Sequence, residues 1–282
     1  MLASLREILS DTRKKGYAVP AFDVFNLETF KAVVEAAEEE KSPVIIMILD
    51  ADMEGGYLRY MAPMMKEAAM SSRIPICLHL DHGKDLDTVA RFIHLGFNSV
   101  MIDASTLPLE RNIEETSRVV RFAHAAGVSV EAELGHVGVG LSDSEEDVKN
   151  FLTVPEEVRL FVEKTGVDAL AVAIGTAHGP YKFKPHLDIP RLKQIAGVTG
   201  TPLVIHGGSL TPDDQMRAAI AAGISKVNIC TELRMAFYRG IKESLPKFPE
   251  HSSPHELLKK SLELVKEVAK NKIYLCGSNN KA

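Results

Sequence analysis

Short apolar runs alternate with longer amphipathic segments through most of this chain. The apolar runs have the length of buried strands, and they predict eight strands, at residues 17–22, 43–48, 75–80, 98–102, 128–133, 168–174, 202–206 and 225–229. Between them, apolar positions recur with the period of a helix, as at residues 27–40, 85–95, 110–126, 155–165 and 211–222. Residues 255–271 predict one further amphipathic helix after the last strand.

This alternation of strand and helix favours a parallel sheet covered by helices. Eight strands are the number that closes a (β/α)8 barrel. The alternative is an open doubly wound sheet, but the first strand is not followed by the G-x-G-x-x-G fingerprint. We therefore predict an α/β fold, a TIM barrel with an extra C-terminal helix, built as one domain over residues 1–282. The long connection from Gly135 to about Val154 predicts a functional lid or a disordered loop.

Composition narrows the possible partners and the compartment. The net charge of −5 argues against nucleic acid as a main partner, because phosphate binding usually requires a basic face. No apolar run approaches the length of a membrane span. The cysteines are widely spaced and form no C-x-x-C pair, so we expect neither a disulfide framework nor a thiolate zinc cluster. These features predict a cytoplasmic protein without nucleic-acid or membrane partners.

Three histidines stand at the ends of different predicted strands, and each is followed by glycine. They are His82, His178 and His206. In a barrel the carboxyl ends of the strands form one rim, where active sites are built. Three imidazoles that converge there would leave an open coordination position for substrate, as a catalytic metal requires. A lone histidine would be read as a core or loop residue, but this repeated placement favours a metal site.

Carboxylates accompany these histidines at the same strand ends. Asp81 directly precedes His82 and could exchange a proton with substrate, or it could orient a histidine. Asp103 and Glu133 end the fourth and fifth strands. They could bind a second cation or hydrogen-bond the histidines, and the sequence leaves this choice open.

Small and hydroxyl residues follow the seventh and eighth strands, where such barrels usually bind phosphate. Backbone N–H groups and a helix start can receive the dianion there. We therefore predict a phosphate site that includes Gly207, Gly208, Ser209, Asn228, Ile229, Cys230 and Thr231. Lys182 could supply positive charge, since it lies four residues after His178.

Several motifs in order resemble the class II fructose-bisphosphate and tagatose-bisphosphate aldolase family. The resemblance covers almost the whole chain, through YAVPAF (17–22), LDHG (80–83), VEAELG (130–135), AVAIGTAHGPYK (171–182), VIHGGS (204–209), KVNICTEL (226–233) and KIYLCGSNNKA (272–282). It implies a lyase that cleaves a ketose 1,6-bisphosphate or ketose 1-phosphate into dihydroxyacetone phosphate and an aldehyde. It also implies a homodimer or homotetramer.

The resemblance further implies roles for the candidate residues. A Zn²⁺ ion held by the three histidines would stabilise the charge left on the donor half, and Asp81 would protonate the aldehyde oxygen. Asp103 and Glu133 match positions that carry a second divalent or monovalent cation. The dihydroxyacetone phosphate half would contact Gly179, Lys182, Gly207, Ser209, Asn228 and Thr231. The alternatives are a metal-dependent hydrolase and a non-catalytic relative on the same barrel.

The chain departs from the family pattern in three places. Leu141 falls where a lid glutamate usually removes the donor proton, and Asp143, Glu145 or Glu146 could replace it. Family members that act on 1,6-bisphosphates usually carry a D-P-R motif whose arginine reaches a neighbouring subunit and holds the far phosphate. Residues 253–255 align with this motif, and His255 stands at the arginine position. The first strand ends with Asp23 and Phe25, where the family has Asn-x-x-Asn or a similar pattern, although Asn26 is kept. These departures leave open whether the substrate carries a second phosphate.

Overall fold

The computed structural model describes residues 1–182 and 184–282, with Glu145 and Lys149 described by their backbone alone. Its eight strands are all parallel and form a closed barrel in chain order, with β1 paired to β8. The strands are β1 (Val19–Asp23), β2 (Val44–Leu49), β3 (Ile76–Gly83), β4 (Ser99–Ile102), β5 (Ser129–Leu134), β6 (Ala169–Val172), β7 (Leu203–Ile205) and β8 (Ile224–Ile229). Each overlaps a predicted strand, and the predicted TIM barrel with a C-terminal helix is confirmed.

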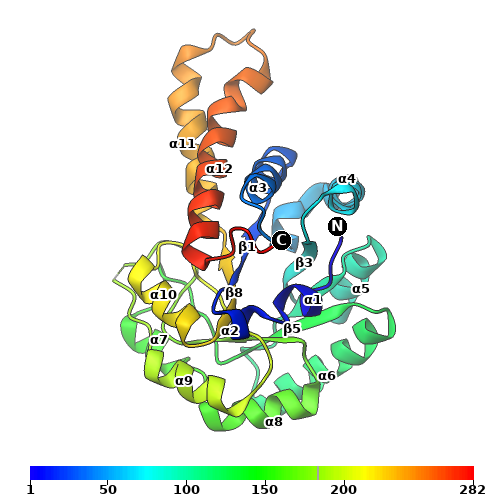
Figure 1. Ribbon diagram of the computed structural model, residues 1–282, viewed down its shortest axis with the longest axis vertical. Helices are drawn as coiled ribbons and strands as arrows, with labels where there is room; N and C mark the ends of the chain where they lie inside the picture. Colours follow the sequence, from blue (N-terminus) through cyan, green and yellow to red (C-terminus); the bar gives the residue numbers. More distant parts are fainter. Residues whose placement is uncertain (183) are drawn as a thin grey trace.

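Helices cover the outside of this barrel (Figure 1). They are α1 (Leu5–Leu9), α2 (Thr12–Lys15), α3 (Leu27–Glu39), α4 (Leu58–Ser71), α5 (Leu86–His94), α6 (Leu109–Ala125), α7 (Glu145–Asn150), α8 (Pro155–Thr165), α9 (Ile189–Val198), α10 (Asp213–Ala221), α11 (Thr231–Ser244) and α12 (Pro254–Cys276), with short 3₁₀ turns η1 (Asp50–Gly56) and η2 (Leu245–Lys247). No helix in the described residues combines the length and the apolarity that a bilayer span needs.

Local capping explains where several of these helices begin and end. The Asn26 and Asp85 side chains accept hydrogen bonds from the backbone N–H groups of Thr29 and Thr88, which caps α3 and α5. The last helix continues past the predicted residue 271 because Ile273 and Cys276 are buried. It ends at Gly277, whose φ of +68° suits a glycine at a helix C-terminus.

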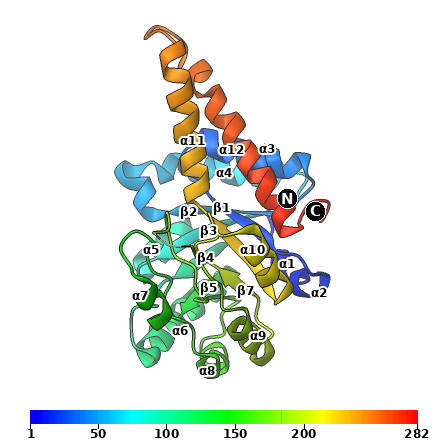
Figure 2. The same ribbon diagram turned by 90° about the vertical axis from the view of Figure 1, so that its left-hand side faces the viewer.

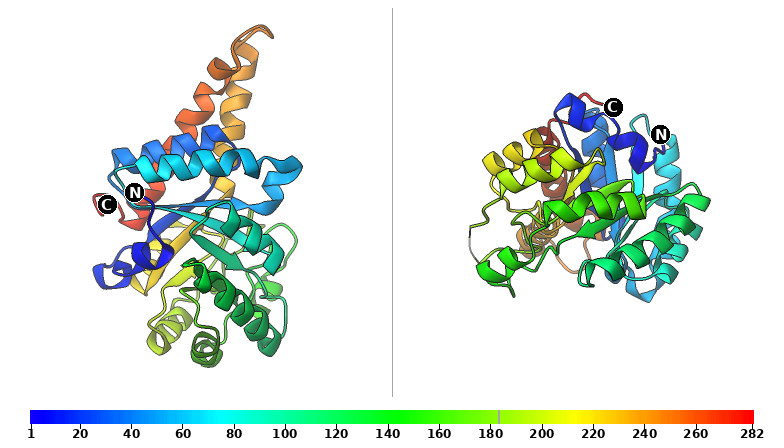
Figure 3. Two further views of the ribbon diagram at one scale, coloured as in Figure 1. Left: turned by 90° about the vertical axis from the view of Figure 1, so that its right-hand side faces the viewer. Right: turned by 90° about the horizontal axis from the view of Figure 1, so that it is seen from below.

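The last two long helices form an arm that projects beyond the barrel. Figures 1 and 2 show α11 and α12 side by side, with the turn between them at the far tip. The lower part of α12 packs on α3, where Lys266 and Lys270 pair with Glu39. The two chain termini lie close together near this packing, as all views of Figure 3 agree.

Two apolar regions make up the core. The larger one fills the space between the strands and the helices around them. The smaller one lies inside the barrel and is built from inward-facing residues such as Val19, Ile45, Met47 and Cys77. Alanines at the same level, among them Ala169 and Ala171, are small and leave room for longer side chains inside the barrel.

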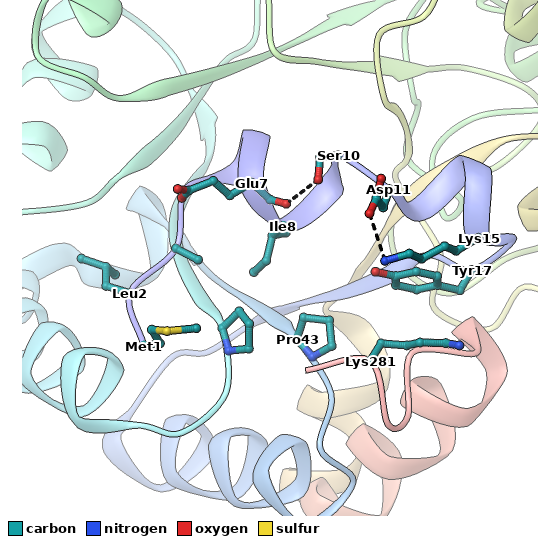
Figure 4. Close-up of a pocket in the computed structure, with 12 residues that line it drawn as sticks. Met1, Leu2, Glu7, Ile8, Ser10, Asp11, Lys15, Tyr17, Pro43 and Lys281 are labelled. Carbon is teal, nitrogen blue, oxygen red and sulfur yellow. Dashed lines mark hydrogen bonds and ion pairs between the residues drawn. The ribbon is translucent and has the colours of Figure 1, made fainter.

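Near the amino ends of the strands, α1 and α2 cover a cavity of about 370 Å³ (Figure 4). Its lining includes Ile8 of α1, together with Tyr17, Pro43 and Pro75, which lie just before the starts of β1, β2 and β3. The candidate histidines stand at the carboxyl ends of the strands, so this cavity is separate from them.

The packing of α11 on α12 generates a stability prediction at Gly240. A Cβ atom placed there would lie 2.4 Å from the backbone N and Cα of Ser261. We expect Gly240→Ala to lower the free energy of unfolding by about 1–3 kcal/mol, as overpacking does. Urea denaturation followed by circular dichroism would measure this.

The matched control for this substitution is Gly197→Ala. Gly197 lies within α9 and has no neighbour within 4 Å of the added methyl group. Because alanine favours the helix, this variant should be about 0.5–1 kcal/mol more stable than the parent. Equal stability of the Gly240→Ala variant and the parent would contradict the packing argument.

Candidate metal centre and active site

The structure brings His82, His178 and His206 together at the carboxyl ends of the strands. His82 lies near the end of β3, His178 in the segment after β6, and His206 directly after β7. One nitrogen from each ring lies within 4.8 Å of the other two. The three rings stand nearly perpendicular to one another, and their centroids are 4.7–5.8 Å apart. This arrangement could hold a metal ion.

The backbone of β3 is irregular where it carries the first of these ligands. His82 has a φ of +48°, which is unusual for a residue other than glycine, and the pairing with β4 shifts between Leu80 and Gly83. A Cβ atom on Gly83 would lie 2.4 Å from the carbonyl oxygen of Met101, so only glycine fits. The bulge therefore aims the imidazole at the rim.

Carboxylates orient two of the three rings. Asp103 Oδ2 lies 2.7 Å from His82 Nδ1, and Glu131 Oε1 lies 2.9 Å from His206 Nε2. The opposite nitrogens, His82 Nε2 and His206 Nδ1, are 3.0 Å apart and face the centre of the cluster. These contacts select which nitrogen of each ring is available as a ligand.

Asp103 and Glu133 differ in the oxygen atoms that they leave available. Both Asp103 oxygens are engaged, one by His82 and the other by the backbone N–H and hydroxyl of Ser105. Glu133 uses one oxygen to accept a hydrogen bond from Val137. Its other oxygen is buried, lacks a hydrogen-bond partner among the described residues and lies 3.6 Å from His206 Nδ1.

The electrostatics of the cluster suit a cation. Burial and the charge of His82 lower the pKa of His178 and of His206 to about 3, which keeps both rings neutral and able to bind a metal. Burial alone would lower the pKa of His82, but Asp81, Asp103 and Glu133 outweigh it and raise the value to about 10. The surroundings therefore favour positive charge here. The buried oxygen of Glu133 that lacks a partner fits the same conclusion.

Asp81 stands inside the rim beside the histidines. Its side chain is almost fully buried, and Asn228 Nδ2 donates a hydrogen bond of 3.1 Å to Oδ1. The other oxygen lies 3.9 Å from His82 Nε2. Asp81 is therefore held next to the centre with one oxygen turned toward it.

Another buried carboxyl, at Asp23, was noted in the sequence only as a departure from the family pattern. It ends β1, is 2% exposed, and its Oδ1 has no hydrogen-bond partner in the described residues. Burial and the charge of Asp81 raise its pKa well above the usual range, while a hydrogen bond with the thiol of Cys230 opposes this. Its position at a strand end is the sequence signal that could have identified it.

The two segments predicted to bind phosphate lie together at the rim. Gly207 has a φ of +63°, and a Cβ atom there would lie 2.4 Å from the carbonyl oxygen of Ala177. Gly208 donates a hydrogen bond to the carbonyl oxygen of Asn228, which joins the two segments. Ser209 Oγ accepts hydrogen bonds from the backbone N–H groups of Cys230 and Glu232 at the start of α11.

The remaining phosphate candidates, Gly179 and Lys182, lie after β6. Gly179 adopts a φ of +79°, and the Lys182 side chain is exposed. Between them, the Tyr181 hydroxyl accepts a hydrogen bond from Ala177 N and donates one to the carbonyl oxygen of Gly207. Tyr181 therefore ties this segment to the loop after β7, a role that the sequence did not indicate.

The long connection after β5 packs against the segment that carries His178. His178 exchanges backbone hydrogen bonds of 2.8 Å with Gly138 and Gly140. Asp143 Oδ2 accepts a hydrogen bond from Val139 N, so this carboxylate closes its own turn. Glu146 is exposed at the start of α7, and the Glu145 side chain lies outside the described residues.

Sequence and structure comparisons identify the family. The profile described as "Fructose-bisphosphate aldolase class-II" matches residues 3–281. The chain belongs to the class II fructose-bisphosphate aldolase family. The crystal structure of the YdjI aldolase from Escherichia coli K12 has 37% sequence identity and a TM-score of 0.90, with 100% of both chains covered.

Two further solved structures share this fold. A candidate fructose-1,6-bisphosphate aldolase from Coccidioides immitis has 27% identity and a TM-score of 0.86, with 98% of this chain and 97% of that chain covered. Fructose-bisphosphate aldolase from Campylobacter jejuni has 24% identity and a TM-score of 0.83, with 100% and 97% covered, and supports the fold alone.

Membership in this family confirms the predicted activity class. The protein is a class II aldolase, a carbon–carbon lyase that carries out aldol cleavage of a phosphorylated ketose. The family is generally zinc-dependent, and a histidine cluster that could hold a metal is present here. The hydrolase and the non-catalytic relative are thereby disfavoured.

Proposed function

We propose that this class II aldolase uses a zinc ion held by His82, His178 and His206 to cleave a ketose 1-phosphate or ketose 1,6-bisphosphate. The products are dihydroxyacetone phosphate and an aldehyde. The observation that carries the proposal is the convergence of three ring nitrogens at the rim beside the buried carboxylate of Asp81. When bound, the ion supplies positive charge that stabilises the electron pair left by carbon–carbon cleavage.

The chain's own residues supply proton transfer. In cleavage, the Asp81 carboxylate accepts the proton of the hydroxyl group that becomes the aldehyde oxygen, and in synthesis it returns that proton. Asn228 holds the carboxylate through Oδ1. Because Asp143 is committed to its own turn, we favour Glu145 or Glu146 as the residue that exchanges the proton of dihydroxyacetone phosphate.

The donor phosphate would bind where the loops after β7 and β8 meet the start of α11. Backbone N–H groups of Cys230 and Glu232 point to Ser209 Oγ, and a helix start favours an anion. The exposed Lys182 adds positive charge from the segment after β6. The residues we assign to this half are Gly179, Lys182, Gly207, Gly208, Ser209, Asn228, Ile229, Cys230 and Thr231.

Asp103 and Glu133 receive different roles in this proposal. Asp103 orients His82, since both of its oxygens are engaged. Glu133 keeps one buried oxygen directed to the centre, so it would contribute to the catalytic ion or to a second divalent or monovalent cation.

We further propose that residues 1–282 form one domain of a cytoplasmic homodimer or homotetramer. Large apolar side chains are exposed on and directly before α4 and at the arm, namely Tyr57, Tyr60, Met64, Met235, Tyr238 and Leu245. Such exposure is typical of surfaces that a partner covers. The cysteines are free, which is consistent with a reducing compartment.

The proposal is tested by an assay of dihydroxyacetone phosphate release from a panel of ketose phosphates. Zinc-loaded protein should release it from at least one member, and the chelator-treated protein should be inactive until zinc is returned. Release that survives removal of all bound metal would contradict a zinc-dependent cleavage.

A second prediction concerns Asp81. We expect Asp81→Asn to lower kcat by about 10²–10⁴-fold, because the amide cannot exchange the proton, while zinc content stays near one ion per chain. Metal analysis and steady-state kinetics would measure the two effects. Unchanged turnover would remove Asp81 from the mechanism.

A third prediction concerns the far end of the substrate. His255 lies in the first turn of α12, where it would meet the substrate of a neighbouring subunit, and histidine is a poorer phosphate clamp than a bidentate arginine. We expect His255→Arg to lower KM for ketose 1,6-bisphosphates by roughly tenfold relative to the 1-phosphates. Identical KM ratios in the two proteins would show that position 255 does not meet substrate.

A further inference from the structure

A fully buried ion pair lies inside the barrel, next to the histidine cluster. Lys226 of β8 and Glu131 of β5 have no exposed side-chain surface, and Lys226 Nζ lies 2.8 Å from Glu131 Oε2. Two buried charges have a desolvation cost that an isolated pair rarely recovers. The location of this pair therefore needs an explanation other than stability.

Glu131 uses its other oxygen to contact the candidate metal centre. Oε1 lies 2.9 Å from Nε2 of His206, whose side chain is also fully buried. A hydrogen bond donated by Nε2 places the ring proton there and leaves Nδ1 without one. Nδ1 is the atom that lies 3.0 Å from His82 Nε2 at the centre. Glu131 therefore sets both the tautomer and the rotation of His206.

Lys226 is the cation that anchors this carboxylate. A further titratable group near Oε2 is His79, whose Nε2 lies 3.9 Å away and whose Nδ1 bonds to Ser99 Oγ. Burial and the charge of Lys226 lower the pKa of His79 well below its usual value, so this ring is neutral. In the part of the chain that the structure describes, Glu131 is thus held by one ion pair and one histidine.

We propose that Lys226 and Glu131 form a positioning pair for the metal centre. Lys226 fixes the Glu131 carboxylate, and Glu131 presents Nδ1 of His206 to the ion. Neither residue touches the reacting atoms, so their effect is expected in metal affinity before it is expected in chemistry. The inference rests on the proposed function, because it requires that the three histidines bind a divalent ion.

The first test measures Zn²⁺ and Co²⁺ affinity of chelator-stripped protein by competition with a chelator. In Lys226→Met, the carboxylate loses its anchor, and we expect binding to weaken by about 10–100-fold, as loss of such supporting contacts usually does. The visible absorption of the Co²⁺ form should change as well, since it reports ligand geometry. Parent-like affinity together with a parent-like spectrum would overturn the proposal.

A matched control separates metal positioning from general stability. Lys272 of α12 is also buried and pairs with Glu232, and within the described residues its ion pair does not involve a histidine. Lys272→Met should lower thermal stability and leave Co²⁺ affinity unchanged. Equal loss of affinity in Lys226→Met and Lys272→Met would indicate a structural effect alone and would contradict the proposal.

Two double variants keep the test decisive if the single variant does not fold. Glu131→Gln with Lys226→Met removes both charges of the pair and keeps a side-chain oxygen that can accept a hydrogen bond from His206 Nε2. Glu131→Leu with Lys226→Met lacks the acceptor. We expect the glutamine form to bind Co²⁺ at least tenfold more tightly than the leucine form, and equal affinities would refute the positioning role. If the parent protein binds neither ion, the proposed zinc centre itself is wrong, which is a separate outcome.

Discussion

The pairing of β1 with β8 is the constraint on which the rest of the structure depends. It closes the sheet through the register that sets Val19 opposite Lys226 and Phe22 opposite Ile229. An open sheet would spread the strand ends along a line, whereas closure arranges them in a ring. Histidines from β3, from the segment after β6 and from the end of β7 can meet only because of that ring.

Closure also creates the interior in which polar groups are held away from water. Alanines such as Ala169 and Ala171 leave space inside the barrel, and Glu131 and Lys226 occupy the same interior. Charged groups in this water-free interior interact strongly, and a group that loses its partner there cannot be hydrated instead. Apolar residues fill the end of the barrel interior near α1 and α2. Nearer the rim, Lys226 contacts Glu131 and Glu131 contacts His206, so polar groups of the interior hold a residue of the candidate metal centre.

The loops at the rim are held by contacts that differ in kind. Backbone hydrogen bonds join the connection after β5 to the segment of His178, and the Tyr181 hydroxyl joins that segment to the loop after β7. The loops after β7 and β8 are joined at Gly208 and Ser209, and a Cβ atom on Gly208 would lie 2.8 Å from the carbonyl oxygen of Asn228. A network of this kind would hold the proposed phosphate site and the candidate metal centre at a defined separation, which aldol chemistry on one small substrate requires.

The sequence by itself determined the eight strands, and their number and the residues at their ends predicted the barrel and the three candidate histidines, because the period of a buried strand and the residues that follow it are local properties. It also placed the glycines and hydroxyls of the rim and the acid before His82. Which carboxylate serves which histidine was decided only by tertiary structure. Asp103 directly follows β4 and Glu131 lies in β5, 21 and 75 residues from their partners, and nothing in the spacing assigns one to His82 and the other to His206. The burial of Asp23, the bond of Tyr181 and the partner of Lys226 were likewise hidden, since each depends on side chains that meet across the closed barrel.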